Sequence, residues 1–202
     1  MRDLNRRRVL QILGATPAVA ALAFTEAEAE QAATQAQAAR RTAAATGTAY
    51  KPKFFTASEY ATIVLLADLI IPKDDRSGSA SEAGAPEFVD HIVNVQQERQ
   101  VAARGGLKWL DTESLRRFDK TFVHAADAQR RLILDDIAYP AKADTRFSHG
   151  VRFFSGLRDL VAAGFWSSKA GVKDLGYQGN VPNVWDGAPQ AVLDKLGVKY
   201  EA

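Results

Sequence analysis

The chain has 202 residues, of which 47% are hydrophobic and 25% charged, with a formal net charge of +2 and no cysteine. Without cysteine, the chain holds no disulfide, no thioether-attached haem, no iron–sulfur cluster and no thiolate zinc site. Basic and acidic residues are interleaved rather than gathered in basic clusters, which argues against nucleic acid as a partner.

The first 29 residues have the features of an export signal. Arg6 and Arg7 stand in the run Asn-Arg-Arg-Arg-Val-Leu-Gln at 5–11, just ahead of an apolar stretch over 12–24. This pattern predicts recognition by the twin-arginine translocon, which carries folded proteins, and therefore a periplasmic location. The apolar stretch is shorter than the roughly 20 residues that a membrane-spanning helix needs. We therefore expect cleavage after Ala29, and any membrane association to arise through a complex.

Residues 30–53 are predicted to be a linker. Up to Tyr50 they are almost entirely Ala, Gln, Thr and Arg. Such residues bury too little apolar surface to offset the entropy lost on ordering. We expect a flexible tether, with at most transient helix, ahead of one folded domain over 54–202.

The domain is predicted to begin with two helices. Thr56 and Glu59 form a capping-box pattern, and the apolar helix that follows ends at Pro72. The polar stretch 73–84 reads as a solvated loop. Its Asp74-Asp75 pair raises a calcium hypothesis, but the run lacks the regular ligand spacing of an EF-hand. Pro86 suits the first turn of a second helix, which can extend through the polar stretch 96–104.

The remaining helices follow after a glycine pair. Gly105-Gly106 is expected to interrupt the pattern and to be followed by short packed helices, in which Trp109 is a core residue. A helix over 128–138 is capped by Asp127, and a long helix spans roughly 150–163. No run has the alternation of a strand. The prediction is an all-α, compact multi-helix domain with an irregular aromatic and Gly-rich C-terminal segment.

The sequence holds no recognisable catalytic, cofactor or metal motif. Dinucleotide and phosphate-binding glycine patterns are absent, and no Ser lies in a Gly-x-Ser-x-Gly run. His91, His124 and His149 lack the i, i+4 spacing of a helical metal pair. Asp135 and Asp136 are adjacent, so on a helix they do not face each other. We assign no catalytic, cofactor-binding or metal-binding residue to this chain.

A set of ordered segments carries a family resemblance over about residues 54–185. The segments are Phe-Thr-Ala-Ser-Glu-Tyr at 55–60, Asp-Leu-Ile-Ile-Pro at 68–72, Glu-Ala-Gly at 82–84, Phe-Val-Asp at 88–90, Gly-Leu-Lys-Trp-Leu-Asp at 106–111, Gly-Phe-Trp-Ser-Ser at 164–168 and Asp-Leu-Gly-Tyr-Gln-Gly-Asn at 174–180. Together they resemble the gluconate 2-dehydrogenase subunit 3 family, the small accessory subunits of exported FAD-dependent sugar or alcohol dehydrogenases.

The resemblance implies a non-catalytic subunit. The expected partner is a large FAD-containing dehydrogenase subunit of the glucose–methanol–choline type, which oxidises a sugar, sugar acid or alcohol. A c-type cytochrome with haem c is a further expected partner. Because the large subunit commonly lacks its own signal, this chain is expected to be its escort through the twin-arginine translocon.

A partner interface is expected in the C-terminal segment, because aromatic side chains supply most interface hot spots. The candidates are Phe165, Trp166, Gly176, Tyr177, Gly179, Asn180 and Trp185. For each aromatic, the alternative is a place in the domain's own core. Two other functions stay open: a free-standing exported helical binding or scaffold protein, and an enzyme that uses His149 with a carboxylate such as Asp144.

Overall fold

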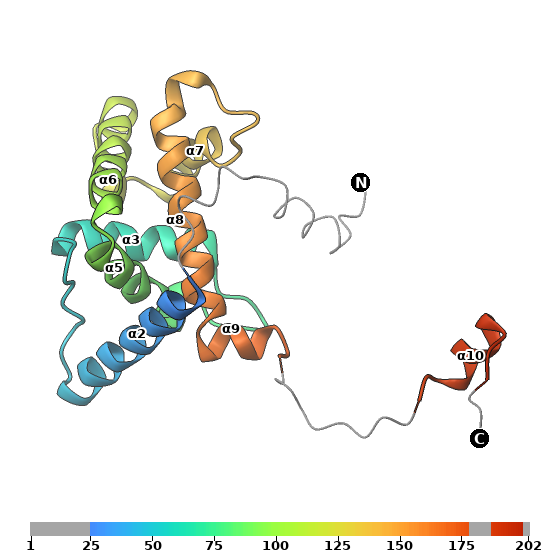
Figure 1. Cartoon of the computed structure of the whole chain (residues 1–202). Coiled ribbons are helices and arrows are strands. Elements are labelled where there is room, and N and C mark those ends of the chain that lie inside the picture. The colour runs from blue at the N-terminus through green and yellow to red at the C-terminus, as the bar shows by residue number, and fades with distance from the viewer. Residues whose placement is uncertain (1–24, 178–186, 200–202) are drawn as a thin grey trace.

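The computed structural model describes residues 25–177 and 187–199 and confirms the all-α fold. Within these ranges every regular element is an α-helix or a short 3-10 helix (Figure 1). The predicted twin-arginine motif lies outside the described residues. None of the helices in the described ranges has the length and apolar character that crossing a membrane requires.

Four helices build the domain: α3 (Ala57–Ile70), α5 (Ala85–Val95), α6 (Gln97–Phe118) and α8 (Ser148–Trp166). Helix α8 runs through the middle of the molecule and packs against both α5 and α6 (Figure 1). The shorter elements are α4 (Ala80–Ala83), η1 (Phe122–His124), α7 (Asp127–Ile137), η2 (Thr145–Phe147), α9 (Lys169–Asp174) and α10 (Gln190–Leu196).

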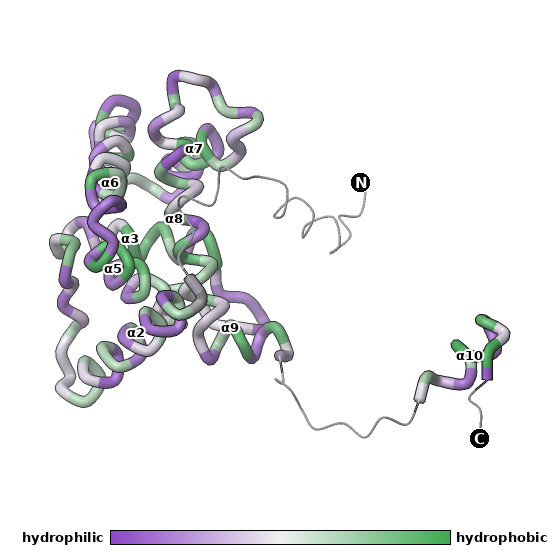
Figure 2. The backbone as a smooth tube through the Cα atoms, viewed as in Figure 1, coloured by the Kyte–Doolittle hydropathy of each residue, from purple (hydrophilic) through white to green (hydrophobic). Residues whose placement is uncertain are grey.

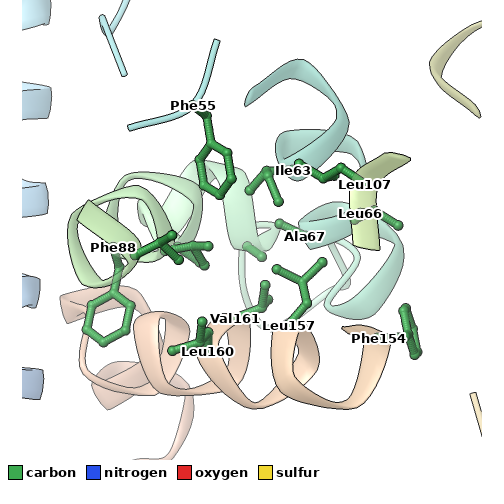
Figure 3. Packing of buried hydrophobic residues seen from close by; sticks show 14 of the residues in the cluster. Phe55, Ile63, Leu66, Ala67, Phe88, Leu107, Phe154, Leu157, Leu160 and Val161 are labelled. Carbon is green, nitrogen blue, oxygen red and sulfur yellow. The ribbon is translucent and has the colours of Figure 1, made fainter. Parts of the chain in front are cut away.

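One hydrophobic core lies where α3, α5, α6 and α8 meet. Figure 3 shows side chains from these helices converging, with Phe55 entering from the segment ahead of α3. Helix α3 is hydrophobic along most of its length (Figure 2), as expected of a helix enclosed by its neighbours. The largest fully buried side chains include Phe88, Phe122, Phe165, Ile63 and Leu66.

The predicted linker is wrong for residues 30–46, which belong to helix α2 (Glu26–Thr46). Thr25 and Glu28 close a capping box at its start, and the helix packs against α5. Ala32 and Ala36 are buried in the core cluster. Alanine loses no side-chain entropy on burial and has the highest helix propensity, so an Ala-rich segment can dock without large apolar residues.

Polar contacts fix the outer end of α2. The Arg40 guanidinium donates to the Ser81 carbonyl oxygen at 2.5 Å and lies 3.7 Å from the Glu87 carboxylate. Glu87 is buried, and this burial raises the pKa of its carboxyl group. Helix α2 is therefore a docked part of the domain rather than a tether.

Helix boundaries follow the predicted caps. Helix α3 starts after the Thr56 capping box and ends at Ile70, just ahead of Pro72. Helix α7 is displaced by one residue from its predicted range, and α8 extends beyond its predicted ends. These boundaries come from local chemistry that the sequence displays directly.

The predicted break at the glycine pair is wrong, because α6 continues through Gly105 and Gly106 to Phe118. The second helix instead stops at Gln96, between α5 and α6. Gly106 lies so close to α8 that an added Cβ would be 2.0 Å from the Phe153 ring. This glycine serves helix packing rather than chain reversal.

An ion-pair network joins α6 to α7. The Glu113 carboxylate accepts hydrogen bonds from Arg116 at 2.7 Å and from Arg117 at 2.6 Å, and Arg117 also pairs with Asp136 at 2.8 Å. The hydrogen bonds from Arg116 and Arg117 outweigh the effect of burial and lower the pKa of Glu113 to about 2. The carboxylate is therefore ionised at neutral pH.

Candidate functional site

The C-terminal end of α8 carries the predicted interface residues, and the structure separates them. Phe165 is 1% exposed and belongs to the core, so its side chain does not face a partner. Trp166 is 39% exposed. Its ring packs edge to face against that of Phe165, with 4.9 Å between the ring centroids. Adjacent positions on a helix point in different directions, which explains this division.

The turn after α8 is tightly built. Ser168 caps α9 by accepting a hydrogen bond from the Gly171 N–H at 3.1 Å. An added Cβ at Gly171 would be 2.2 Å from the Phe165 carbonyl oxygen, so only glycine fits there. Arg76 binds both the carbonyl and the carboxylate of Asp174, which ties α9 to the loop ahead of α4.

This end of the molecule presents aromatic surface to solvent. Tyr177 is 69% exposed and follows Gly176, whose φ of 65° lies in the left-handed region that favours glycine. Leu175 is exposed beside them. The candidates Gly179, Asn180 and Trp185 lie outside the described residues. Part of the predicted segment is also helical, in α9 and α10.

A second site, which the sequence did not reveal, is a cavity of about 450 Å³ beside α6 and α8. Its walls include Val101, Gly105 and Trp109 from α6, and Arg152, Phe153 and Gly156 from α8. Its floor is apolar and consists of Phe55, Ile63, Val89, Leu157 and Leu160. We call this cavity the α6–α8 groove. Its size falls within the range of sites that hold ligands or the anchors of a partner.

Asp90 positions the part of the floor that precedes α3. Its carboxylate is fully buried and accepts hydrogen bonds from the Tyr50 hydroxyl at 2.8 Å and the Lys53 N–H at 2.7 Å. It also accepts from the N–H groups of Phe54 and Phe55, both at 3.1 Å. Burial, reinforced by the hydrogen bond to Asp90, raises the pKa of Tyr50. The sequence signal for this role is an acidic residue among the apolar residues of α5, which also contains Glu87.

The histidine and carboxylate considered for catalysis are not paired. Asp144 caps η2 by accepting from the Arg146 N–H at 2.9 Å, and no hydrogen bond joins it to His149. His149 is exposed at the start of α8, on the border of the groove. His91 has its pKa lowered, mainly by burial. The described residues therefore show no His–carboxylate pair arranged for acid–base chemistry.

In the described part of the chain, no group of three or more His, Asp or Glu side chains is placed so that it could hold a metal ion. The Asp74 carboxylate instead accepts hydrogen bonds from the N–H groups of Arg76 and Ser77, at 2.9 and 2.8 Å. These backbone hydrogen bonds, most of all the one from Ser77, lower the pKa of the Asp74 carboxyl group. This residue holds the loop in a turn.

The comparison with family models gives a match. The family model described as gluconate 2-dehydrogenase subunit 3 matches residues 57–187, from the start of α3 past α9. Neither the curated proteins nor the solved structures contain a match. The family model spans more than half of the chain and includes the aromatic end of α8 and every lining residue of the groove except Phe55. The chain therefore belongs to the gluconate 2-dehydrogenase subunit 3 family.

Proposed function

We propose that this chain is the non-catalytic small subunit of a periplasmic FAD-dependent dehydrogenase of the glucose–methanol–choline type. The partner oxidises a sugar, sugar acid or alcohol, and this chain is its assembly partner and its escort through the twin-arginine translocon. The observation that carries the proposal is the family match over 57–187 in a chain that begins with the Arg6-Arg7 pattern.

The combination of an export signal and an accessory domain in one chain has a physical rationale. A flavoprotein that binds FAD in the cytoplasm must cross the membrane folded, and a twin-arginine signal serves folded cargo. A subunit that carries the signal on a stable helical domain can export a partner that has none. In this arrangement FAD belongs to the large subunit, and haem c belongs to a c-type cytochrome that takes the electrons onward. This chain has no cysteine to which a haem could be attached.

The surface at the end of α8 supports an assembly role. Trp166 exposes aromatic area beside the turn fixed by Ser168 and Gly171, so little entropy is lost when a partner covers it, and Tyr177 exposes its ring just beyond α9. Gly176 remains with them as a candidate interface residue. Gly179, Asn180 and Trp185 stay predictions from the sequence.

Affinity purification of a C-terminally tagged copy from the periplasm tests the proposal. We expect a yellow complex in which a large oxidoreductase chain carries FAD. Replacing Arg6 and Arg7 by Lys should leave both this chain and the flavoprotein in the cytoplasm, whereas Lys at Arg2 and Arg8 serves as the matched control. A colourless chain recovered alone would overturn the proposal and favour a free-standing binding or scaffold protein.

A further inference from the structure

Two glycines, Gly105 on α6 and Gly156 on α8, keep the α6–α8 groove open. Helices α6 and α8 run antiparallel and touch where Gly106 meets Phe153 and where an added Cβ at Gly150 would lie 2.4 Å from the Trp109 ring. Gly105 and Gly156, on the same two helices, have no atom within 4 Å of the Cβ position. Both line the cavity, so the absence of their side chains leaves the space empty.

The groove joins an apolar floor to an apolar rim. Phe55, Ile63 and Leu157, which are labelled in Figure 3, line the floor and are part of the buried core. At the rim, Val101 on α6 is 84% exposed. A small ligand inside the cavity would leave this valine in water. A polypeptide segment lying along the groove would cover the cavity and the rim together, which favours a protein occupant.

The mouth of the groove presents the Arg152 guanidinium. Arg99 and Glu98 also line the mouth, and the Glu28 carboxylate lies near Arg99 as well. Arg152 is exposed, and in the described part of the chain no carboxylate lies within ion-pair distance of it. An occupant with carboxylates beside its apolar side chains complements this mouth. The chain's own leader, with its arginine run at 6–8, does not.

We propose that the α6–α8 groove receives an amphipathic helix of the flavoprotein partner. The apolar face of that helix fills the space over Gly105 and Gly156 and covers Val101, and its carboxylates pair with Arg152. A helix that lays its apolar face in a hydrophobic groove is a common mode of recognition. This inference rests on the proposed function, because the flavoprotein is the occupant. It adds a second contact surface to the aromatic end of α8.

Thiol labelling tests the groove directly, since a chain without cysteine gives every introduced cysteine a unique signal. We compare the full tagged chain carrying Val101→Cys with one carrying Leu132→Cys, a control on α7 that is also exposed. Maleimide modification of this chain is followed by mass spectrometry, in isolation and in the purified yellow complex. We expect at least about tenfold slower modification at position 101 in the complex and no comparable change at 132.

Labelling of the isolated chain at position 101 distinguishes the other possible occupants of the groove. If position 101 is already protected there, the flavoprotein is not the occupant and the inference is overturned. Protection that disappears when residues 1–24 are removed would assign the groove to the chain's own leader. Protection that rises with protein concentration would assign it to a second copy of the chain.

A filling variant separates this inference from the proposed function. Gly156→Leu adds a side chain in open space and raises helix propensity, so the fold is retained. It should reduce the flavin recovered per tagged chain at least about fivefold, whereas Arg158→Leu, exposed on the same helix, should not. Full recovery of flavin with Gly156→Leu would overturn the inference about the groove but leave the proposed function intact. No flavoprotein with the unmodified chain would overturn both.

Discussion

Replacing Asp90 by Ala should be among the most damaging single changes in the domain. The carboxylate oxygens accept four hydrogen bonds at 2.7 to 3.1 Å, from one hydroxyl and three backbone N–H groups. The Phe55 N–H is buried and has no other acceptor once the carboxylate is gone, whereas the others can partly rehydrate. An unpaired buried donor costs about 1–3 kcal/mol. The summed loss in unfolding free energy should be about 3–5 kcal/mol.

Urea denaturation followed by far-ultraviolet circular dichroism measures this loss. Tyr50→Phe removes one of the four donors and should cost only about 1 kcal/mol. Asp90→Asn keeps one accepting oxygen but places an amide N–H₂ against donors, so its cost should lie between the other two. A loss below about 1 kcal/mol for Asp90→Ala would refute the reasoning, because ordinary surface substitutions already reach about half that value.

The same substitution should open the groove from below. Asp90 holds residues 53–55 against α5, and Phe55 forms part of the groove floor. Amide hydrogen exchange over this segment should therefore accelerate in Asp90→Ala before global unfolding is reached. Unchanged exchange would show that Phe55 is held by its hydrophobic contacts alone.

Three further predictions follow from single contacts. Folding lowers the pKa of Glu113 from 4.5 to about 2, so its pairing stabilises the domain fully above pH 4.5 and is lost as pH falls through 2. Glu113→Gln should flatten this part of the stability profile by about 2 kcal/mol in acid titrations. Gly105→Ala should raise the unfolding free energy by about 0.5–1 kcal/mol, while Gly106→Ala should lower it by about 1–3, because only the second Cβ meets an aromatic ring. Phe165→Ala should cost about 3–5 kcal/mol in thermal unfolding and Trp166→Ala much less; equal losses would contradict their different burial.

The sequence predicted what local chemistry determines. The capping box at Thr56 and Glu59, the apolar run that follows it and Pro72 beyond its end predicted helix α3 with its boundaries. The all-α class followed from the absence of alternating runs. These signals act between residues close in sequence, so they can be read without the fold.

Tertiary contacts decided the features that the sequence prediction missed. Helix α2 is helical and docked because α5 offers a surface that alanines fit, which composition alone does not disclose. Gly106 gave a false break because its close approach to Phe153 depends on α8, far along the chain. The groove likewise brings together residues from the segment before α3 and from α3, α5, α6 and α8. No single segment of the chain carries its signature.

The start of α2 also bears on how the exported chain is trimmed. The predicted cut after Ala29 falls within the first turns of this helix, whereas a peptidase needs an extended strand. Cutting there would remove the Thr25–Glu28 cap and the hydrogen bond from Gln96 to Glu28. It would also place a new positive α-amino group at the helix N-terminus, where the helix dipole disfavours it. Docking of α2 therefore opposes cleavage after Ala29. The rate of signal cleavage would report the stability of the docked helix.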